Sequence, residues 1–313
     1  MADSALPQLT DGSVHLSDGG LETTLVFRDG VELPDFAAFP LLETEEGQSR
    51  IASYFTPYFD LAERLGAGFV LDTPTWRANP DWGRRLGYDE AALAEANRQA
   101  VEYVAELAST RQAIPMVLNG VIGPRGDGYV VGDLMTADEA ADYHSLQANA
   151  FAASGAQMLS ALTMTYTAEA IGVVRAAGAA GIPVVVSFTV ETDGRLPSGQ
   201  ALSEAVTEVD EATGGAAAYF MVNCAHPSHF LSVLDEGPWL ERVKGVRANS
   251  STKSHAELDE ATELDRGDIP GLARDYGELG RVLPDLRVVG GCCGTDDAHV
   301  AAIAEVLIRP PRL

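Results

Sequence analysis

The chain has 313 residues, 46% of them hydrophobic, a size that suits one large α/β barrel or two modest globular domains. Its 46 acidic side chains outnumber the 21 basic ones, and the net charge of −25 repels nucleic acid and excludes a nucleic-acid-binding function. No apolar run is long enough to cross a bilayer, and residues 1–16 lack a basic leader and an apolar signal core. We therefore expect a cytoplasmic protein with no membrane partner.

Short apolar runs rich in valine, isoleucine and phenylalanine recur along the chain and are typical of buried strands. Segments with a helical period and much alanine, leucine and glutamate lie between them. In chain order, the expected strands are 14–17, 69–72, 115–121, 158–163, 183–188, 219–224, 245–249 and 287–291. The expected helices include 89–110, 136–154, 167–177, 202–212 and 297–307. The second of these opens on Thr136 and Glu139, a capping-box pair.

The alternation of strand and helix signals predicts parallel strands, and their number favours a closed (β/α)8 TIM barrel of the α/β class over an open doubly wound sheet. No linker or break in composition divides the sequence, so we expect residues 1–313 to form one barrel domain. Active sites of such barrels lie where strands end and the following loops begin. Polar or glycine-containing segments stand at these points and should face one mouth: 18–20, 72–76, 123–126, 223–224 and 290–294.

The cysteines of the chain are Cys224, Cys292 and Cys293, too few for a disulfide framework and typical of metal binding or catalysis in a reducing compartment. A barrel would bring all three to one rim, because they end the sixth and eighth expected strands. Three sulfur ligands with an open fourth position are typical of catalytic zinc. Each cysteine could instead be a small core residue. His226 could complete the zinc ligands, but we expect it to face the following helix.

Several motifs resemble those of the homocysteine S-methyltransferases, a family that includes the betaine-dependent enzymes and the homocysteine domain of cobalamin-dependent methionine synthase. The most specific are the Asn-Cys pair at 223–224 and the Gly-Gly-Cys-Cys segment at 290–293. Weaker matches are 18–24, 122–124, 187–189 and 198–200. The resemblance spans nearly the whole chain.

The resemblance implies a (β/α)8 barrel in which Cys224, Cys292 and Cys293 bind Zn²⁺ and activate a thiol for methylation. Zinc stabilises the deprotonated thiol, whose sulfur attacks a methyl group of an onium donor such as S-methylmethionine, S-adenosylmethionine or a betaine. Homocysteine, which becomes methionine, is the default acceptor. The expected partners are therefore a small-molecule thiol and a methyl donor, and the expected process is methionine biosynthesis.

The resemblance also implies substrate contacts at the mouth of the barrel. Asp18 matches a position that helps hold the amino group of homocysteine, and the amides of Gly19 and Gly20 would receive its carboxylate. Thr73 matches a position on the second strand, and Asn223 belongs to the Asn-Cys pair. Asp18 could alternatively be a turn residue that caps its own backbone.

Leu162 stands where the family usually has a glutamate that binds the substrate ammonium group. Losing that ion pair would cost about 1 to 3 kcal/mol. Glu191 or Asp72 could supply a replacement carboxylate; otherwise the acceptor is a different thiol or a selenol. The segment 248–251 also keeps only part of the family's motif after the seventh strand.

Four aromatic residues near the expected rims, Phe27, Trp76, Trp82 and Tyr166, could line a pocket for a methylated onium group, although such residues more often belong to the core. A second class of function is a non-catalytic zinc or thiol sensor, because vicinal thiols suit redox sensing. The substrate-binding turn at Asp18 weighs against it. A lyase or hydrolase using zinc-bound water would favour histidine and carboxylate ligands over three thiolates. The pattern does not predict an oligomeric state.

Overall fold

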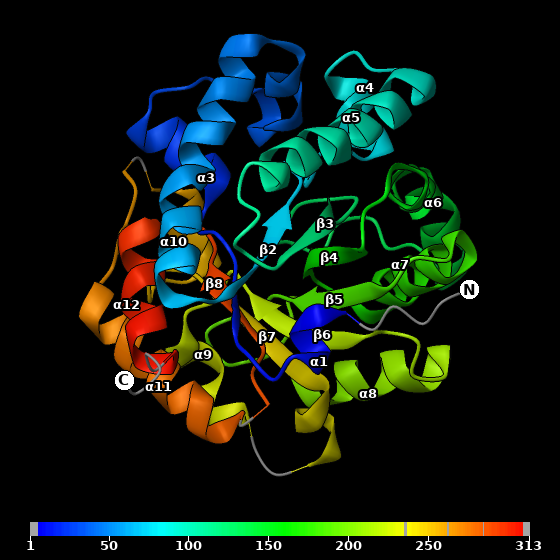
Figure 1. The fold of residues 1–313 in the computed structure, drawn as a ribbon. Coiled ribbons are helices and arrows are strands. Elements are labelled where there is room, and N and C mark those ends of the chain that lie inside the picture. Colours follow the sequence, from blue (N-terminus) through cyan, green and yellow to red (C-terminus); the bar gives the residue numbers. More distant parts are fainter. Residues whose placement is uncertain (1–5, 235–236, 262, 284, 309–313) are drawn as a thin grey trace.

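Eight parallel strands form the centre of the computed structural model, which describes residues 6–234, 237–261, 263–283 and 285–308. They follow one another around a closed barrel in the order of the sequence, and β8 pairs with β1. Helices surround the strands (Figure 1). The predicted (β/α)8 TIM barrel is confirmed, and the open sheet is excluded.

The strands are β1 (His15–Leu16), β2 (Gly68–Asp72), β3 (Met116–Ile122), β4 (Met158–Met164), β5 (Val184–Phe188), β6 (Tyr219–Asn223), β7 (Val243–Ala248) and β8 (Val288–Gly291). The longer helices are α3 (Glu45–Leu65), α5 (Glu90–Ser109), α6 (Ala137–Ser154), α7 (Thr167–Ala180), α8 (Leu202–Thr213), α11 (Ile269–Val282) and α12 (Asp297–Leu307). The short ones are α1 (Pro7–Thr10), α2 (Leu21–Thr23), α4 (Pro80–Arg85), α9 (Pro227–Phe230) and α10 (His255–Asp259). Each predicted strand overlaps an observed one, with ends that differ by at most two residues.

The capping box at the start of α6 is present as predicted. The Thr136 hydroxyl accepts a hydrogen bond from the Glu139 amide, and the Glu139 carboxylate accepts one of 2.8 Å from the Thr136 amide. Two amide groups that the helix itself leaves unpaired are thereby satisfied.

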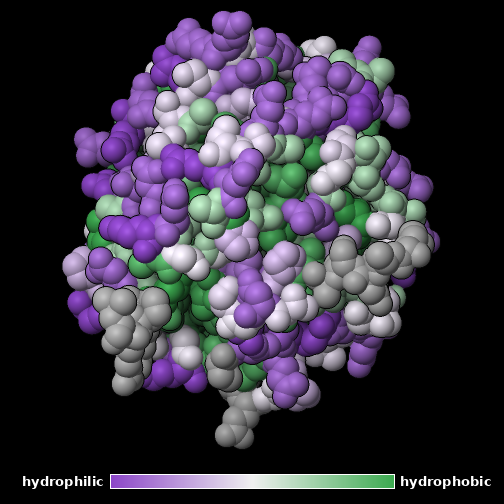
Figure 2. Space-filling view, in the orientation of Figure 1, coloured by the Kyte–Doolittle hydropathy of each residue, from purple (hydrophilic) through white to green (hydrophobic). Residues whose placement is uncertain are grey.

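Hydrophilic side chains cover most of the molecular face in Figure 2, and hydrophobic residues show mainly in recesses between them. This distribution fits the large excess of acidic over basic residues. Within the described residues, no helix is both long enough and apolar enough to span a membrane.

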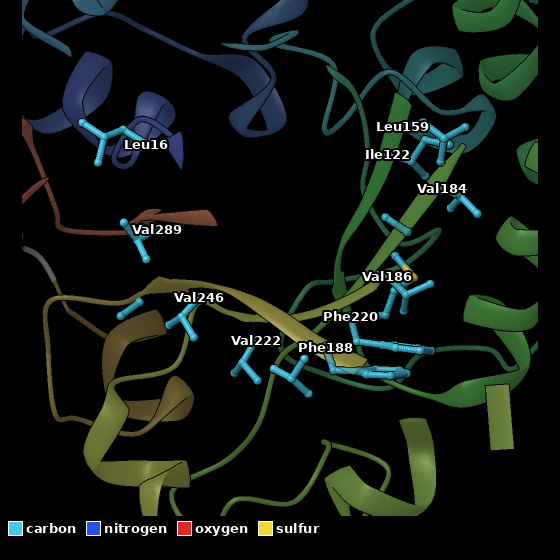
Figure 3. Close-up of a cluster of buried hydrophobic side chains, with 14 of the residues drawn as sticks. Leu16, Ile122, Leu159, Val184, Val186, Phe188, Phe220, Val222, Val246 and Val289 are labelled. Atoms are coloured by element: carbon cyan, nitrogen blue, oxygen red, sulfur yellow. The ribbon is translucent and has the colours of Figure 1, made fainter. Parts of the chain in front are cut away.

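The strand side chains form two layers, because successive residues of a strand point to opposite faces. The outward residues pack in the cluster shared with the helices, and Figure 3 labels Leu16, Ile122, Leu159, Val184, Val186, Phe188, Phe220, Val222, Val246 and Val289. The inward residues form a separate cluster that includes Val70, Val117, Val185 and Met221.

The same alternation carries polar side chains into the barrel at the carboxyl ends of the strands. Asp72, Asn223 and Arg247 are buried there, beside the apolar Leu162. At the amino end, Gln8 of α1 donates hydrogen bonds to the Tyr219 hydroxyl (3.3 Å) and to the Met158 sulfur (3.2 Å). The interior of the barrel is therefore closed at its amino end and polar at its carboxyl end.

Candidate active site

A cavity of about 380 Å³ opens at the carboxyl ends of the strands. Its apolar wall includes Val121 of β3 and Leu162 of β4, and its polar wall includes Asn223 of β6 and Arg247 of β7. A cavity of this size at this end of the barrel suits a small-molecule substrate.

The three cysteines meet at the cavity. The Sγ atoms of Cys224, Cys292 and Cys293 all lie within 4.8 Å of one another. Zinc–sulfur bonds of about 2.3 Å in a tetrahedral site place sulfur atoms roughly 3.8 Å apart, so small side-chain movements would let all three bind one ion. His226 is directed elsewhere: its Nδ1 lies 2.8 Å from Ser228 of α9, and its Nε2 lies 3.9 Å from Asp275 of α11.

Unusual backbone conformations bring the thiols together. Cys224 has a φ of 55°, in the left-handed region that favours glycine. Gly294, with a φ of 76°, turns the chain after the neighbouring cysteines. Gly291 has no room for a side chain, because a Cβ there would collide with Thr295. The chain therefore turns directly after the cysteine pair.

The thiols share hydrogen bonds that make Cys292 the acidic member. Hydrogen bonds from Cys224 and Cys293, assisted by the charge of Arg247, hold the pKa of Cys292 well below its usual value. The hydrogen bond to Cys292 raises the pKa of Cys224, and hydrogen bonds to both neighbours raise that of Cys293; burial adds to each. Cys292 is therefore the most acidic thiol of the cluster.

Tyr129 lies against the cluster. Its hydroxyl is 3.0 Å from the Cys224 sulfur and donates to the Cys293 sulfur at 3.4 Å. Its ring stacks on His255 at a centroid distance of 4.1 Å, and the His255 Nε2 lies 3.0 Å from the Cys224 carbonyl oxygen. Burial and the nearby cysteines raise the pKa of Tyr129 well above its usual value, so the phenol stays protonated.

Arg247 occupies the centre of the polar wall. It forms ion pairs with Asp18 and Asp72 and donates a 3.2 Å hydrogen bond to the Gly291 carbonyl oxygen. Asp18 also accepts a 2.9 Å hydrogen bond from the Tyr54 hydroxyl. Burial raises the pKa of Asp18 to about 7, although Arg247 opposes the shift. Arg247 therefore balances part of the negative charge of both carboxylates.

The sequence of the chain was compared with known families and structures. The sequence model of the homocysteine S-methyltransferase family matches residues 15–307. The chain belongs to this family. It is accordingly an S-methyltransferase. A search of curated proteins found no match.

The barrel of this homocysteine S-methyltransferase family member is similar to that of the homocysteine methyltransferase MmuM from Escherichia coli. The metallated form of MmuM matches with a TM-score of 0.71 and 21% identity, over 94% of this chain and 96% of MmuM. The oxidized form matches with a TM-score of 0.71 and 20% identity, over 93% and 95% of the two chains. At 20% to 21% sequence identity, this similarity is evidence for the fold alone.

The other predicted substrate contacts, Gly19, Gly20, Thr73 and Asn223, all line the cavity. The Gly20 amide is already engaged, since it donates a 3.1 Å hydrogen bond to the Thr295 carbonyl oxygen. The Thr73 hydroxyl lies 2.6 Å from that of Thr75 and accepts a hydrogen bond from a backbone amide of β3. These two groups therefore hold the wall of the cavity together in this structure.

Asn223 connects two parts of the site. Its Oδ1 accepts hydrogen bonds from the Thr163 amide (2.9 Å) and the Ser187 hydroxyl (2.7 Å), and its Nδ2 lies 3.8 Å from the Cys292 sulfur. Thr163 has a φ of 63° and directly follows Leu162. The side chain of Asn223 thus links the end of β4 to the thiols.

The two carboxylates suggested as replacements for the missing glutamate differ in position. Glu191 does not line the cavity, because its carboxylate turns to His255, 3.3 Å away. Asp72 lines the cavity but is paired with Arg247 and accepts a 2.7 Å hydrogen bond from Asn119. Glu22, which was not singled out from the sequence, does line it.

Two of the four suggested aromatic residues lie at the cavity, namely Phe27 and Trp76. The other two suggestions are wrong, because Trp82 and Tyr166 are not among the lining residues. The guanidinium groups of Arg77 and Arg85 lie 3.8 Å and 4.7 Å from the centroid of the Trp82 ring. The Tyr166 hydroxyl accepts a 3.2 Å hydrogen bond from the Met135 amide.

Proposed function

We propose that the protein is a zinc-dependent S-methyltransferase that moves a methyl group from an onium donor to a thiol, with homocysteine to methionine as the default reaction. The observation that carries this proposal is the convergence of the sulfur atoms of Cys224, Cys292 and Cys293 within 4.8 Å at the cavity. Three thiolates are a donor set that favours zinc and leaves a fourth position for a substrate sulfur. Bound zinc would stabilise the deprotonated form of that sulfur at neutral pH.

The chain's own residues supply position and environment. In the transfer, the acceptor sulfur forms a bond to the methyl carbon, and the donor's heteroatom keeps the electron pair of the bond that breaks. A thiolate and an onium cation become neutral products, so an environment of low polarity favours the reaction. Val121, Leu162 and Trp76 provide such an environment on one wall of the cavity. Trp76 and Phe27 also offer aromatic faces to the onium group.

Tyr129 has to move before a substrate sulfur can join the cluster. Its hydroxyl contacts the sulfur atoms of Cys224 and Cys293. An incoming thiol would replace these contacts with its own.

A second candidate keeps the same chemistry and changes the acceptor to another thiol or a selenol. The observation in its favour is that Leu162, only 8% exposed, presents an apolar side chain to the cavity. In either case the three free thiols require a reducing compartment, which supports our prediction of a cytoplasmic protein.

The test is a matrix of candidate thiols and selenols against S-methylmethionine, S-adenosylmethionine and betaine, read by mass spectrometry on zinc-loaded enzyme. We expect methylated product from at least one pair and none from the Cys292→Ser variant. Zinc binding without product from any pair would support the sensor instead. Full activity of Cys292→Ser would reject the zinc mechanism.

A further inference from the structure

Six carboxylate side chains line the cavity, and they differ in what they bind. They are Asp18, Glu22, Asp72, Asp127, Glu263 and Asp265. Asp18 and Asp72 are paired with Arg247. Asp265 accepts a 2.8 Å hydrogen bond from the Ser251 hydroxyl and lies 3.3 Å from Lys253.

The remaining three carboxylates lie on other parts of the wall. Asp127 lies 3.8 Å from Arg77 and accepts a hydrogen bond from the Tyr129 amide. Glu263 is exposed to solvent. Glu22 lines the cavity, is only partly exposed, and within the described residues has no ion pair or hydrogen bond to another side chain.

Glu22 stands in the first turn of α2, directly after the turn formed by Asp18, Gly19 and Gly20. Burial raises its pKa to about 7, and the negative charges of Asp18 and Cys292 contribute. Arg247 is already matched by two carboxylates. Arg77, which also lines the cavity and whose charge reaches Glu22, lies 3.8 Å from Asp127. Neither arginine forms an ion pair with Glu22, so its carboxylate is open to a cationic group in the cavity.

We propose that Glu22 binds the ammonium group of an amino-thiol acceptor and so takes the place of the carboxylate that Leu162 does not provide. This inference rests on the proposed function, since it needs a substrate sulfur at the cysteines. Glu22 and Leu162 line the same cavity from different elements, α2 and β4. A carboxylate on α2 could therefore bind the substrate ammonium group that a carboxylate at the position of Leu162 on β4 would otherwise bind.

The acceptor fits this position better than the donor does. The segment that carries Glu22 lies against the cysteine pair, since the Gly294 amide donates a 3.3 Å hydrogen bond to the Thr23 hydroxyl, and Glu22 and the cysteines line one cavity. An ammonium group at Glu22 and a sulfur at the cysteines can therefore belong to one short molecule. The onium group of the donor has aromatic faces available at Phe27 and Trp76. The methyl group of the donor must also lie in line with the acceptor sulfur. This requirement places the donor away from the site that binds the ammonium group of the acceptor.

The experiment compares two acceptors that differ only in the amino group, homocysteine and 4-mercaptobutanoate, with the donor that supports turnover. We expect the wild-type enzyme to prefer homocysteine. In Glu22→Gln, the KM for homocysteine should rise about 10- to 100-fold, the loss of one buried charged contact, while kcat stays within about threefold. The KM for 4-mercaptobutanoate and the zinc content should not change.

Two further variants and a binding measurement complete the test. Glu22→Asp keeps the charge and should raise the KM for homocysteine less than Glu22→Gln does. Glu211→Gln removes an exposed carboxylate of α8, outside the cavity, and should change nothing. Calorimetric titration of the zinc-loaded variants with homocysteine, without donor, should show the same order of affinities.

Several results would overturn the inference. They are equal use of both acceptors by the wild type, equal losses for both acceptors in Glu22→Gln, and a rise confined to the KM of the donor. If the wild type methylates no thiol at all, the proposed function fails, and the calorimetric titration still decides whether Glu22 binds the ammonium group.

Discussion

The two ends of the barrel interior differ in charge. At the amino end, Gln8 makes neutral hydrogen bonds, and the Asp11 carboxylate that pairs with the buried His15 is itself exposed to solvent. At the carboxyl end, Arg247 is buried between Asp18 and Asp72 beside three thiols. Burying charges is costly, so an end that only supports the fold can remain neutral, whereas an end that binds ions and polar substrates cannot. The distribution of buried charge thus identifies the functional end independently of any motif.

The largest effect should come from removing a thiol at the charged end. Cys224→Ser deletes one of three metal ligands, and we expect loss of bound zinc and of at least about 100-fold in activity, since even residues that only support a ligand cost 10- to 100-fold. Metal analysis and product formation measure both. Gln8→Ala, at the neutral end, is the matched control and should keep its zinc and its activity.

Removing the central cation should cause the next largest effect, on stability. Arg247→Met leaves Asp18 and Asp72 buried without a partner of opposite charge, which should cost about 3 to 5 kcal/mol of unfolding free energy in the metal-free protein. Adding Asp18→Asn and Asp72→Asn should restore most of this loss. Urea unfolding measures all three proteins. A loss below about 1 kcal/mol for Arg247→Met alone would show that the triad is not held together by charge.

A smaller effect concerns the pH dependence of stability. Burial raises the pKa of Glu22 from 4.5 to about 7. The folded state therefore holds this proton more tightly than the unfolded state, and the contribution of Glu22 decreases as the pH rises towards and through 7. Between about pH 6 and 8 the metal-free wild type should lose about 1 kcal/mol more than Glu22→Gln. Parallel pH profiles of the two proteins would contradict the shift.

The smallest effect is expected at the neutral end. Gln8→Ala removes two uncharged hydrogen bonds, to Tyr219 and Met158, and should cost about 1 kcal/mol of unfolding free energy. Urea unfolding measures this change, and activity should stay at the wild-type level. A large loss of activity in this variant would mean that the two ends are not independent.

The strands could be predicted from the sequence because buried parallel strands are short, apolar and rich in β-branched residues. Two long helices, α3 and α11, were not singled out. Pro57 lies inside α3, and α11 contains Gly271, Gly277 and Gly280; internal proline and glycine both weaken a helical pattern. Packing against the barrel stabilises these helices, and a local pattern does not contain that information.

The position of the cysteines could be predicted because residues at strand ends face the mouth of any such barrel. The residues that surround the cysteines could not be predicted. Arg247 pairs with Asp18 across 229 positions of the chain, and its only local signal is an arginine within an apolar strand. Tyr129 lies in a glycine-containing loop whose path no periodicity determines. Glu22 could be read in the sequence, but its position in the lining of the same cavity as Cys292 could not.

The left-handed backbone at Cys224 offers a way to interpret related sequences. A non-glycine residue with that conformation costs about 1 to 2 kcal/mol, so the local backbone favours glycine there. Natural selection that keeps a cysteine here therefore acts against the preference of the backbone for glycine. A descendant of this barrel that no longer used its metal would gain stability by replacing the cysteine with glycine. Glycine at this position would therefore mark relatives that have abandoned the chemistry while keeping the fold.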